Sequence, residues 1–248
     1  MATPLYGFLR DHFMKLRTAI VTGAMLVSGL QLLAGCATLP PQNKPPLSPG
    51  REMETLQSSV TIAVRTGEKS AGGRGYLIYR HPDRFHFVLL SPFGSTLFEL
   101  YLDGERLTCV LPSRKTAYAG LVSELPDNNI LNSWGLMRWA AERTPDREGS
   151  AGTMIGESPT RGRQVVTYDD RGLVEAKEDK EGDRVYYQDY EEVNGVALPR
   201  TIDLHDWRGT SVRIVFDEPE VNGPVEESAF SPVLDGMNVL PIEDFTGW

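Results

Sequence analysis

The sequence predicts a mainly β fold, in which short antiparallel strands form a sheet that curves toward a barrel and a short helical segment covers it. Three observations predict this fold. Short apolar, β-branched runs alternate with turn residues. Several of these runs are apolar on both faces. One longer stretch places its apolar residues at helical spacings.

The first 35 residues have the three parts of an export signal. Lys15 and Arg17 supply positive charge, an apolar run follows from Thr18 to Leu33, and Leu33-Ala34-Gly35-Cys36 closes the segment. The run is short for a transmembrane helix, which needs about 20 apolar residues. The closing tetrapeptide resembles the lipobox cut by the lipoprotein signal peptidase. We therefore expect a signal peptide at 1–35, with an ordinary secretory signal as the alternative.

We expect Cys36 to be the first mature residue and to carry fatty acyl chains such as palmitate as a lipid anchor. Each buried methylene contributes roughly 0.8 kcal/mol, and two or three chains hold a protein on a membrane where one does not. Ala37 stands where the sorting rule known for such proteins places an Asp to retain them in the inner membrane. The expected location is therefore the outer membrane, on its periplasmic face. Met14 is an alternative start, since Met14 to Cys36 alone has normal signal proportions.

Residues 36–53 form the expected tether between the lipid and the domain. Their proline content is typical of an extended, semi-rigid spacer. The prolines are Pro40, Pro41, Pro45, Pro46 and Pro49.

The composition indicates an acidic single domain. The chain carries a formal net charge of −9, and nucleic acid is not an expected partner, because its binding would need a basic patch. With Cys36 consumed by lipid, Cys109 has no disulfide partner, and its place in an apolar strand favours a small core residue over a nucleophile. We expect a monomer.

A first meander of strands opens the domain. Turn residues such as His81-Pro82-Asp83 and Asp103-Gly104 separate the strands. In 85–90 only His86 is polar, so either something covers the second face or the sheet curves around an apolar interior. The expected strands are 60–64, 75–79, 85–90, 96–102 and 106–111.

The expected cover is the stretch 122–142, in which leucines and tryptophans recur at helical spacings. Pro126 and the polar residues after it interrupt the pattern, so two short helices are predicted rather than one. Two interpretations stay open: ordinary amphipathic packing onto the sheet, or a movable lid over a cavity.

A second meander completes the domain, which we place at 54–231. The acidic run Glu175 to Asp183 lacks the ligand spacing and glycine of a calcium-binding EF-hand loop and is interpreted as a solvated hairpin, with no metal site. Residues 232–248 form a C-terminal tail, whose packing the sequence does not predict. The expected strands are 164–168, 173–177, 184–190, 198–205 and 211–216.

The sequence favours a binding protein over an enzyme. It contains no Gly-x-Ser-x-Gly elbow, His-Glu-x-x-His pair, Walker loop or Cys-x-x-Cys. His86 and His205 are lone histidines within strands and are interpreted as structural. Most carboxylates lie in turns, without a buried pair for acid–base work. We therefore predict no catalytic residue and no cofactor.

The segment from Leu89 to Leu100, with Pro92-Phe93-Gly94-Ser95-Thr96 inside it, is similar to the LolB family. Members of this family are outer-membrane lipoproteins that accept other lipoproteins from the periplasmic carrier LolA and place them in the membrane. The resemblance covers roughly residues 55–217. Its weaker blocks are Thr116-Ala117-Tyr118, Leu136-Met137-Arg138-Trp139 and Leu198 to Leu204.

The resemblance implies an unclosed antiparallel β-barrel with a short helical lid and an apolar cavity for acyl chains. It also implies that the loop tip at Phe93 probes the membrane, with a Phe folded back onto the sheet as the alternative. The implied partners are a LolA-type periplasmic carrier, acylated lipoproteins and outer-membrane lipid. The candidate cavity or lid residues are Phe85, Phe87, Leu89, Leu100 and Trp134.

Two departures keep a second function open. Ile78-Tyr79-Arg80 replaces the aromatic–glutamine signature associated with the second strand of the family, and Glu218 to Trp248 extends beyond the usual last strand. Within that extension, Val221-Asn222-Gly223-Pro224 with Phe230 is more similar to the LolA side of the superfamily. The alternative is an envelope lipoprotein of this fold that has no transport role and binds another lipid or a protein partner.

Overall fold

The structure is a computed structural model that describes residues 47, 49–67, 69–126, 131–145 and 150–246. The expected signal peptide at 1–35, the expected lipid anchor Cys36 and the tether before residue 47 lie outside the described residues. No helix within these described ranges is long and apolar enough to cross a membrane.

The strands of the described residues form one sheet, with the order β13-β6-β5-β4-β3-β2-β1-β12-β11-β10-β9-β8-β7. All neighbours are antiparallel except β13 and β6, which are parallel. The bounds are β1 (Thr55–Thr66), β2 (Lys69–Arg80), β3 (Arg84–Leu90), β4 (Thr96–Asp103), β5 (Arg106–Leu111), β6 (Thr116–Leu121), β7 (Gly152–Ser158), β8 (Gly162–Tyr168), β9 (Val174–Asp179), β10 (Arg184–Val193), β11 (Val196–His205), β12 (Thr210–Val221) and β13 (Asn238–Pro241).

The sheet is not closed, because its two edge strands, β7 and β13, do not pair with each other. This confirms the mainly β, unclosed antiparallel fold that the sequence predicts. The expected strands lie within β1 to β5 and, apart from Leu173, within β8 to β12. Three further strands, β6, β7 and β13, were not predicted.

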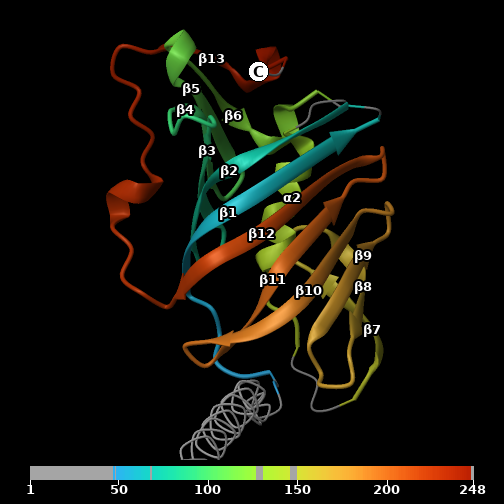
Figure 1. Ribbon diagram of the computed structural model, residues 1–248. Helices are drawn as coiled ribbons and strands as arrows, with labels where there is room; N and C mark the ends of the chain where they lie inside the picture. The colour runs from blue at the N-terminus through green and yellow to red at the C-terminus, as the bar shows by residue number, and fades with distance from the viewer. Residues whose placement is uncertain (1–46, 48, 68, 127–130, 146–149, 247–248) are drawn as a thin grey trace, which may run out of the picture. The chain divides into compact units, whose positions relative to one another are not determined.

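The core lies on the inner face of the sheet, around a single α-helix in the described part of the chain. Helix α2 (Asn132–Ala141) lies within the curve of the sheet (Figure 1) and contacts β11 and β12. Its buried residues point in several directions, which is typical of a helix covered on more than one side. They are Trp134, Leu136, Met137, Trp139 and Ala140. A short 3-10 helix (Val122–Glu124) precedes α2, and the residues 127–130 between them lie outside the described ranges.

The C-terminal extension, residues 222–246, packs on the sheet along much of its length. Phe230 is buried, and the guanidinium groups of Arg80 and Arg84 lie over its ring, 5.0 and 4.6 Å from the centroid. Leu234 and Met237 then cover a small apolar cluster on the outer face of β4, β5 and β6. Figure 1 shows this red-orange segment running outside the strands.

The end of the extension covers the edge of β6 and enters the core. β13 pairs in parallel with β6, and Ile242 and Phe245, each 1% exposed, belong to the main core cluster. A Cβ atom on Gly120 would lie 2.4 Å from a methyl of Ile242, so glycine is needed for this close approach. The extension therefore shields one sheet edge, and β7 remains as the other.

Candidate functional site

An apolar cavity of about 150 Å³ lies beneath the C-terminal half of α2. Strands from both halves of the sheet and the helix itself supply its walls. A buried lysine, Lys177, and Glu142 are the charged side chains on its lining. The apolar lining includes Leu56, Leu77, Met137, Ala140, Leu198 and Phe216.

The cavity continues into a second, more polar space of about 210 Å³. Met53, Ala141 and Tyr190 line both spaces. The outer space is bordered by Arg51 and Arg143, from the segments before β1 and after α2. The apolar cavity thus leads outward at the end of the strands where β1 begins.

The structure brings four of the five predicted cavity residues together. Phe85 lines the cavity. Phe85, Phe87, Leu100 and Trp134 surround a space of only about 10 Å³, and the rings of Phe87 and Trp134 stack with centroids 4.7 Å apart. The fifth residue, Leu89, is buried in the same core cluster. The interior is therefore filled around Trp134 and open around Met137 and Ala140.

Lys177 on β9 fixes the C-terminal end of α2. Its side chain is buried, and Nζ donates hydrogen bonds of 2.8 Å to the carbonyl oxygens of Trp139 and Glu142. Carbonyls at a helix C-terminus lack partners within the helix and attract positive charge. Burial lowers the pKa of Lys177 to about 7, against the opposing effect of the Glu142 carboxylate.

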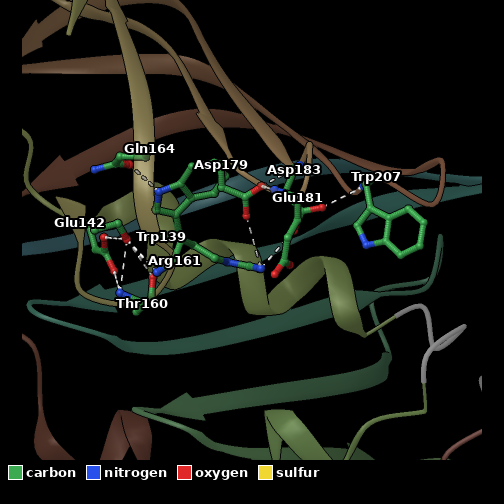
Figure 2. A network of polar contacts seen from close by, with 10 residues as sticks. Trp139, Glu142, Thr160, Arg161, Gln164, Asp179, Glu181, Asp183 and Trp207 are labelled. Atoms are coloured by element: carbon green, nitrogen blue, oxygen red, sulfur yellow. Dashed lines mark hydrogen bonds and ion pairs between the residues drawn. The ribbon is translucent and has the colours of Figure 1, made fainter. Parts of the chain in front are cut away.

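Other side chains hold the same end of the helix. Tyr187 Oη donates to the carbonyl oxygen of Ala140 at 2.8 Å, and Trp139 Nε1 donates to Gln164 Oε1 at 2.7 Å. The Glu142 carboxylate accepts hydrogen bonds from Ser158 Oγ and from the main-chain N–H of Thr160. Figure 2 shows the contacts of Trp139 with Gln164 of β8 and of Glu142 with Thr160 in the turn before β8.

A buried charge cluster lies beside this contact. Asp183 Oδ2 is 3.0 Å from the Arg161 guanidinium, and its Oδ1 accepts the main-chain N–H of Trp207 at 2.8 Å (Figure 2). Burial raises the pKa of Asp183, while the Trp207 N–H and Arg161 oppose the rise. Asp179, Glu181 and Asp183 offer carboxylate oxygens within 4.8 Å of one another, but Arg161 already supplies a cation to the two buried ones.

The interpretation of Glu175 to Asp183 as a solvated hairpin is wrong for three of its residues, because Lys177, Asp179 and Asp183 are buried. The acidic composition hid the alternation of β9, in which residues 177 and 179 point inward and 178 outward. That alternation could have indicated from the sequence that Lys177 is buried. For Gln164 and Tyr187 the sequence indicated only that each lies in a strand.

Phe93 lies at the tip of the β3–β4 turn and is 97% exposed, so it is not folded back onto the sheet. The turn is closed by main-chain hydrogen bonds from Ser91 N to Ser95 O (2.8 Å) and from Gly94 N to Ser91 O (2.9 Å). Gly94 adopts a φ of +82°, which favours glycine. The turn thus holds a large apolar side chain in solvent.

Cys109 lies in the core, as the sequence predicts. It is fully buried, and burial raises its pKa to about 12. The side chain is therefore a thiol rather than a reactive thiolate at neutral pH.

Comparison with solved structures shows what the fold is similar to. A DUF1329 family protein from Desulfovibrio piger superposes with a TM-score of 0.52 at 11% identity, over 72% of this chain and 90% of that one. A domain assigned as an outer membrane lipoprotein-sorting protein from Vibrio parahaemolyticus gives 0.51 at 11% identity, over 71% and 89%. A LolA superfamily protein from Nitrosomonas europaea superposes less closely, at 0.47 and 10% identity, over 73% and 91%.

At these identities the likenesses show the fold alone, and no curated protein is significantly similar to this chain in sequence. The family model described as outer membrane lipoprotein LolB matches residues 54–218, which include all strands from β1 to β11, helix α2 and most of β12. The chain therefore belongs to the LolB family of outer-membrane lipoproteins.

Proposed function

We propose that this protein is a lipid-anchored receptor that accepts lipoproteins by their acyl chains from a periplasmic carrier and inserts them into the outer membrane. The observation that carries the proposal is the apolar cavity between α2 and the inner face of the sheet. Membership of the LolB family supports the choice of ligand.

The acyl chains dictate a direct transfer. Three chains contain roughly 45 methylenes, so at about 0.8 kcal/mol each their exposure to water would cost tens of kcal/mol. The chains therefore pass from the cavity of the carrier to the cavity of the receptor without entering solvent. In each step the acyl chains exchange one apolar environment for another, so no nucleotide is required.

The cavity must enlarge to accept a chain. A cavity of about 150 Å³ holds a molecule the size of benzene, whereas a fatty acyl chain has more than twice as many carbons. Helix α2 is the part that can move, since side-chain contacts rather than sheet hydrogen bonds hold it. In this proposal α2 is a lid, and the structure is its closed state.

Phe93 serves the release step. Exposing a large apolar side chain is unfavourable unless an apolar phase receives it, and insertion returns roughly 1.5–3 kcal/mol. Its exposure on a closed turn supports a role in contacting the bilayer during insertion.

The test is transfer of a labelled lipoprotein from its carrier to outer-membrane vesicles by the Phe93→Glu variant. The assay uses a non-lipidated, soluble form of the receptor. We expect the variant to accept the lipoprotein from the carrier but to keep it bound in the soluble fraction instead of passing it to the vesicles. Ile155→Glu is the matched control, because Ile155 is also exposed (61%) but lies on the outer face of β7. Normal delivery by Phe93→Glu would remove Phe93 from this role.

The small volume of the cavity, about 150 Å³, favours a second candidate, an envelope lipoprotein that binds a smaller lipid and has no transport role. Deleting the protein from its cell separates the two candidates. Mislocalised lipoproteins are expected for the receptor, and correctly placed lipoproteins for the alternative.

A further inference from the structure

A second exposed aromatic side chain lies at the same end of the sheet as Phe93. Thr66 pairs with both Lys69 and Thr210, and Leu90 pairs with Arg74. The β1–β2, β3–β4 and β11–β12 turns therefore share one end of the strands. Trp207, in the β11–β12 turn, is 59% exposed.

The turn that carries Trp207 is held as firmly as the one that carries Phe93. Asp206 N donates to Thr210 O at 2.9 Å, and Gly209 N donates to Asp206 O at 3.0 Å. The main-chain N–H of Trp207 is bound to the buried carboxylate of Asp183. In Figure 2 the indole ring points away from this carboxylate.

Exposed basic side chains lie near both aromatic residues: Arg74 pairs with Leu90 beside the Phe93 turn, and the Arg208 guanidinium lies 4.8 Å from the centroid of the Trp207 ring. Arg65 lies on the strand between them. Acidic residues such as Asp206 and Glu181 lie in turns at the same end, so the basic character is local to the two aromatic side chains.

We propose that this end is a bilayer-docking face, in which Trp207 is a second apolar contact beside Phe93 and the basic side chains bind anionic phospholipid headgroups. The proposal rests on the proposed function for the role of Phe93. Tryptophan is favoured at the level of lipid headgroups, where its ring is partly apolar and partly polar. Arginine and lysine near that surface are attracted to anionic lipids.

The anchor allows this orientation. The docking face lies at the far end of β1 from residue 54, and a strand of 12 residues is about 40 Å long. Arg51 N donates to Gly195 O in the β10–β11 turn, so the segment before it, 37–50, sets the reach and can span at most about 50 Å. A chain anchored at Cys36 can therefore bring the docking face to the same membrane.

The experiment measures quenching of Trp207 by lipid. Full-length lipidated protein carrying Trp248→Phe is reconstituted in phosphatidylethanolamine–phosphatidylglycerol vesicles with or without brominated acyl chains. Trp134 and Trp139 are 3% and 0% exposed, so Trp207 is the accessible indole among these three. We expect brominated lipid to reduce the emission, and Trp207→Phe to abolish at least half of that reduction. The double variant Arg65→Glu/Arg74→Glu should weaken the quenching by brominated lipid at least twofold.

Ile155→Ser, the matched control on β7, should leave the quenching unchanged. Equal emission with brominated and with unbrominated lipid would overturn the docking face. The docking face would also be overturned if the soluble carrier, and not the lipid, shielded Trp207 from solvent. Quenching unaffected by the two charge reversals would overturn the headgroup contact. Because the readout needs no transfer, a quenched Trp207 in a protein whose deletion leaves lipoproteins correctly placed would sink the receptor function alone. Blocked delivery with an unquenched Trp207 would sink this inference alone.

Discussion

The Nζ atom of Lys177 lies 2.8 Å from the carbonyl oxygen of Trp139, in the last turn of α2, and both residues are buried. One strand side chain thereby satisfies carbonyls at the end of the helix that covers the cavity. If α2 is a lid, this contact must break whenever the cavity opens. Lys177 is therefore the first place to test how firmly the lid is held.

Replacing Lys177 with Met is expected to loosen the C-terminal turn of α2. Loss of the amine removes the side-chain donor from the carbonyls of Trp139 and Glu142, of which, among the described residues, only that of Trp139 keeps a main-chain donor, the Glu142 N–H at 3.2 Å. The expected cost is about 1–3 kcal/mol. Hydrogen exchange of the Glu142 amide, which bonds to Arg138 O in that turn, should accelerate about tenfold. Lys180→Met, at an exposed lysine in the next turn, is the control. Equal protection in both variants would show that Lys177 does not hold the helix.

Lys177 also makes stability depend on pH. Its pKa is about 7 in the folded protein and about 10.5 when unfolded, so between these values the unfolded chain binds the extra proton. The contribution of Lys177 to the free energy of unfolding should therefore rise between pH 7 and 9.5. Urea titrations across this range should show the rise, and Lys177→Met should remove it. The same slope in the variant would contradict a neutral buried amine.

The C-terminal extension is expected to be part of the stable core. Phe245 is 1% exposed and contacts Tyr118 edge to face, with centroids 5.3 Å apart. Phe245→Ala should reduce the free energy of unfolding by about 3–5 kcal/mol. Val239→Ala, at a half-exposed neighbour, should change it by less than about 0.5 kcal/mol. A loss below about 1 kcal/mol at Phe245 would mean that the extension is only loosely attached.

The Arg161–Asp183 pair should be coupled more strongly than a surface pair. Their side chains are 24% and 6% exposed and 3.0 Å apart. A double-mutant cycle with Arg161→Gln and Asp183→Asn should give about 1–3 kcal/mol. The matched pair Arg184–Glu178 is 3.1 Å apart but 48% and 47% exposed, and should give a clearly smaller coupling energy because solvent screens it. Equal coupling energies would contradict the assigned burial.

The sequence was sufficient to predict the long apolar strands but not the three weak ones. β6 contains two alanines and a glycine, β7 contains two glycines, and β13 is only four residues long. These strands form because a neighbour pairs with them, which local propensity does not report. For the same reason Ile242 and Phe245 gave no periodic signal, although both are core residues.

The candidate site was predicted in part. The turn at Pro92-Phe93-Gly94 was predicted from its residues, but the exposure of Phe93 was implied by the family resemblance, with a Phe folded back onto the sheet as the alternative, and the structure has it exposed. Of the predicted interior residues, Phe85 lines the cavity, whereas Trp134 and Phe87 surround a much smaller space; Ala140, which the sequence did not single out, borders the cavity. Which interior positions remain unfilled depends on packing across the whole sheet, and no local pattern encodes it.

The central claim is that acyl chains enter the interior beneath α2, and photo-crosslinking tests it most directly. A lipoprotein whose acyl chains carry a terminal diazirine is delivered by its carrier, irradiated, and the labelled peptides are identified by mass spectrometry. The account predicts labels on Met137 of α2 and on Leu198 of β11, which both line the cavity. Labels confined to the outer face of the sheet, with none on these two residues, would contradict it.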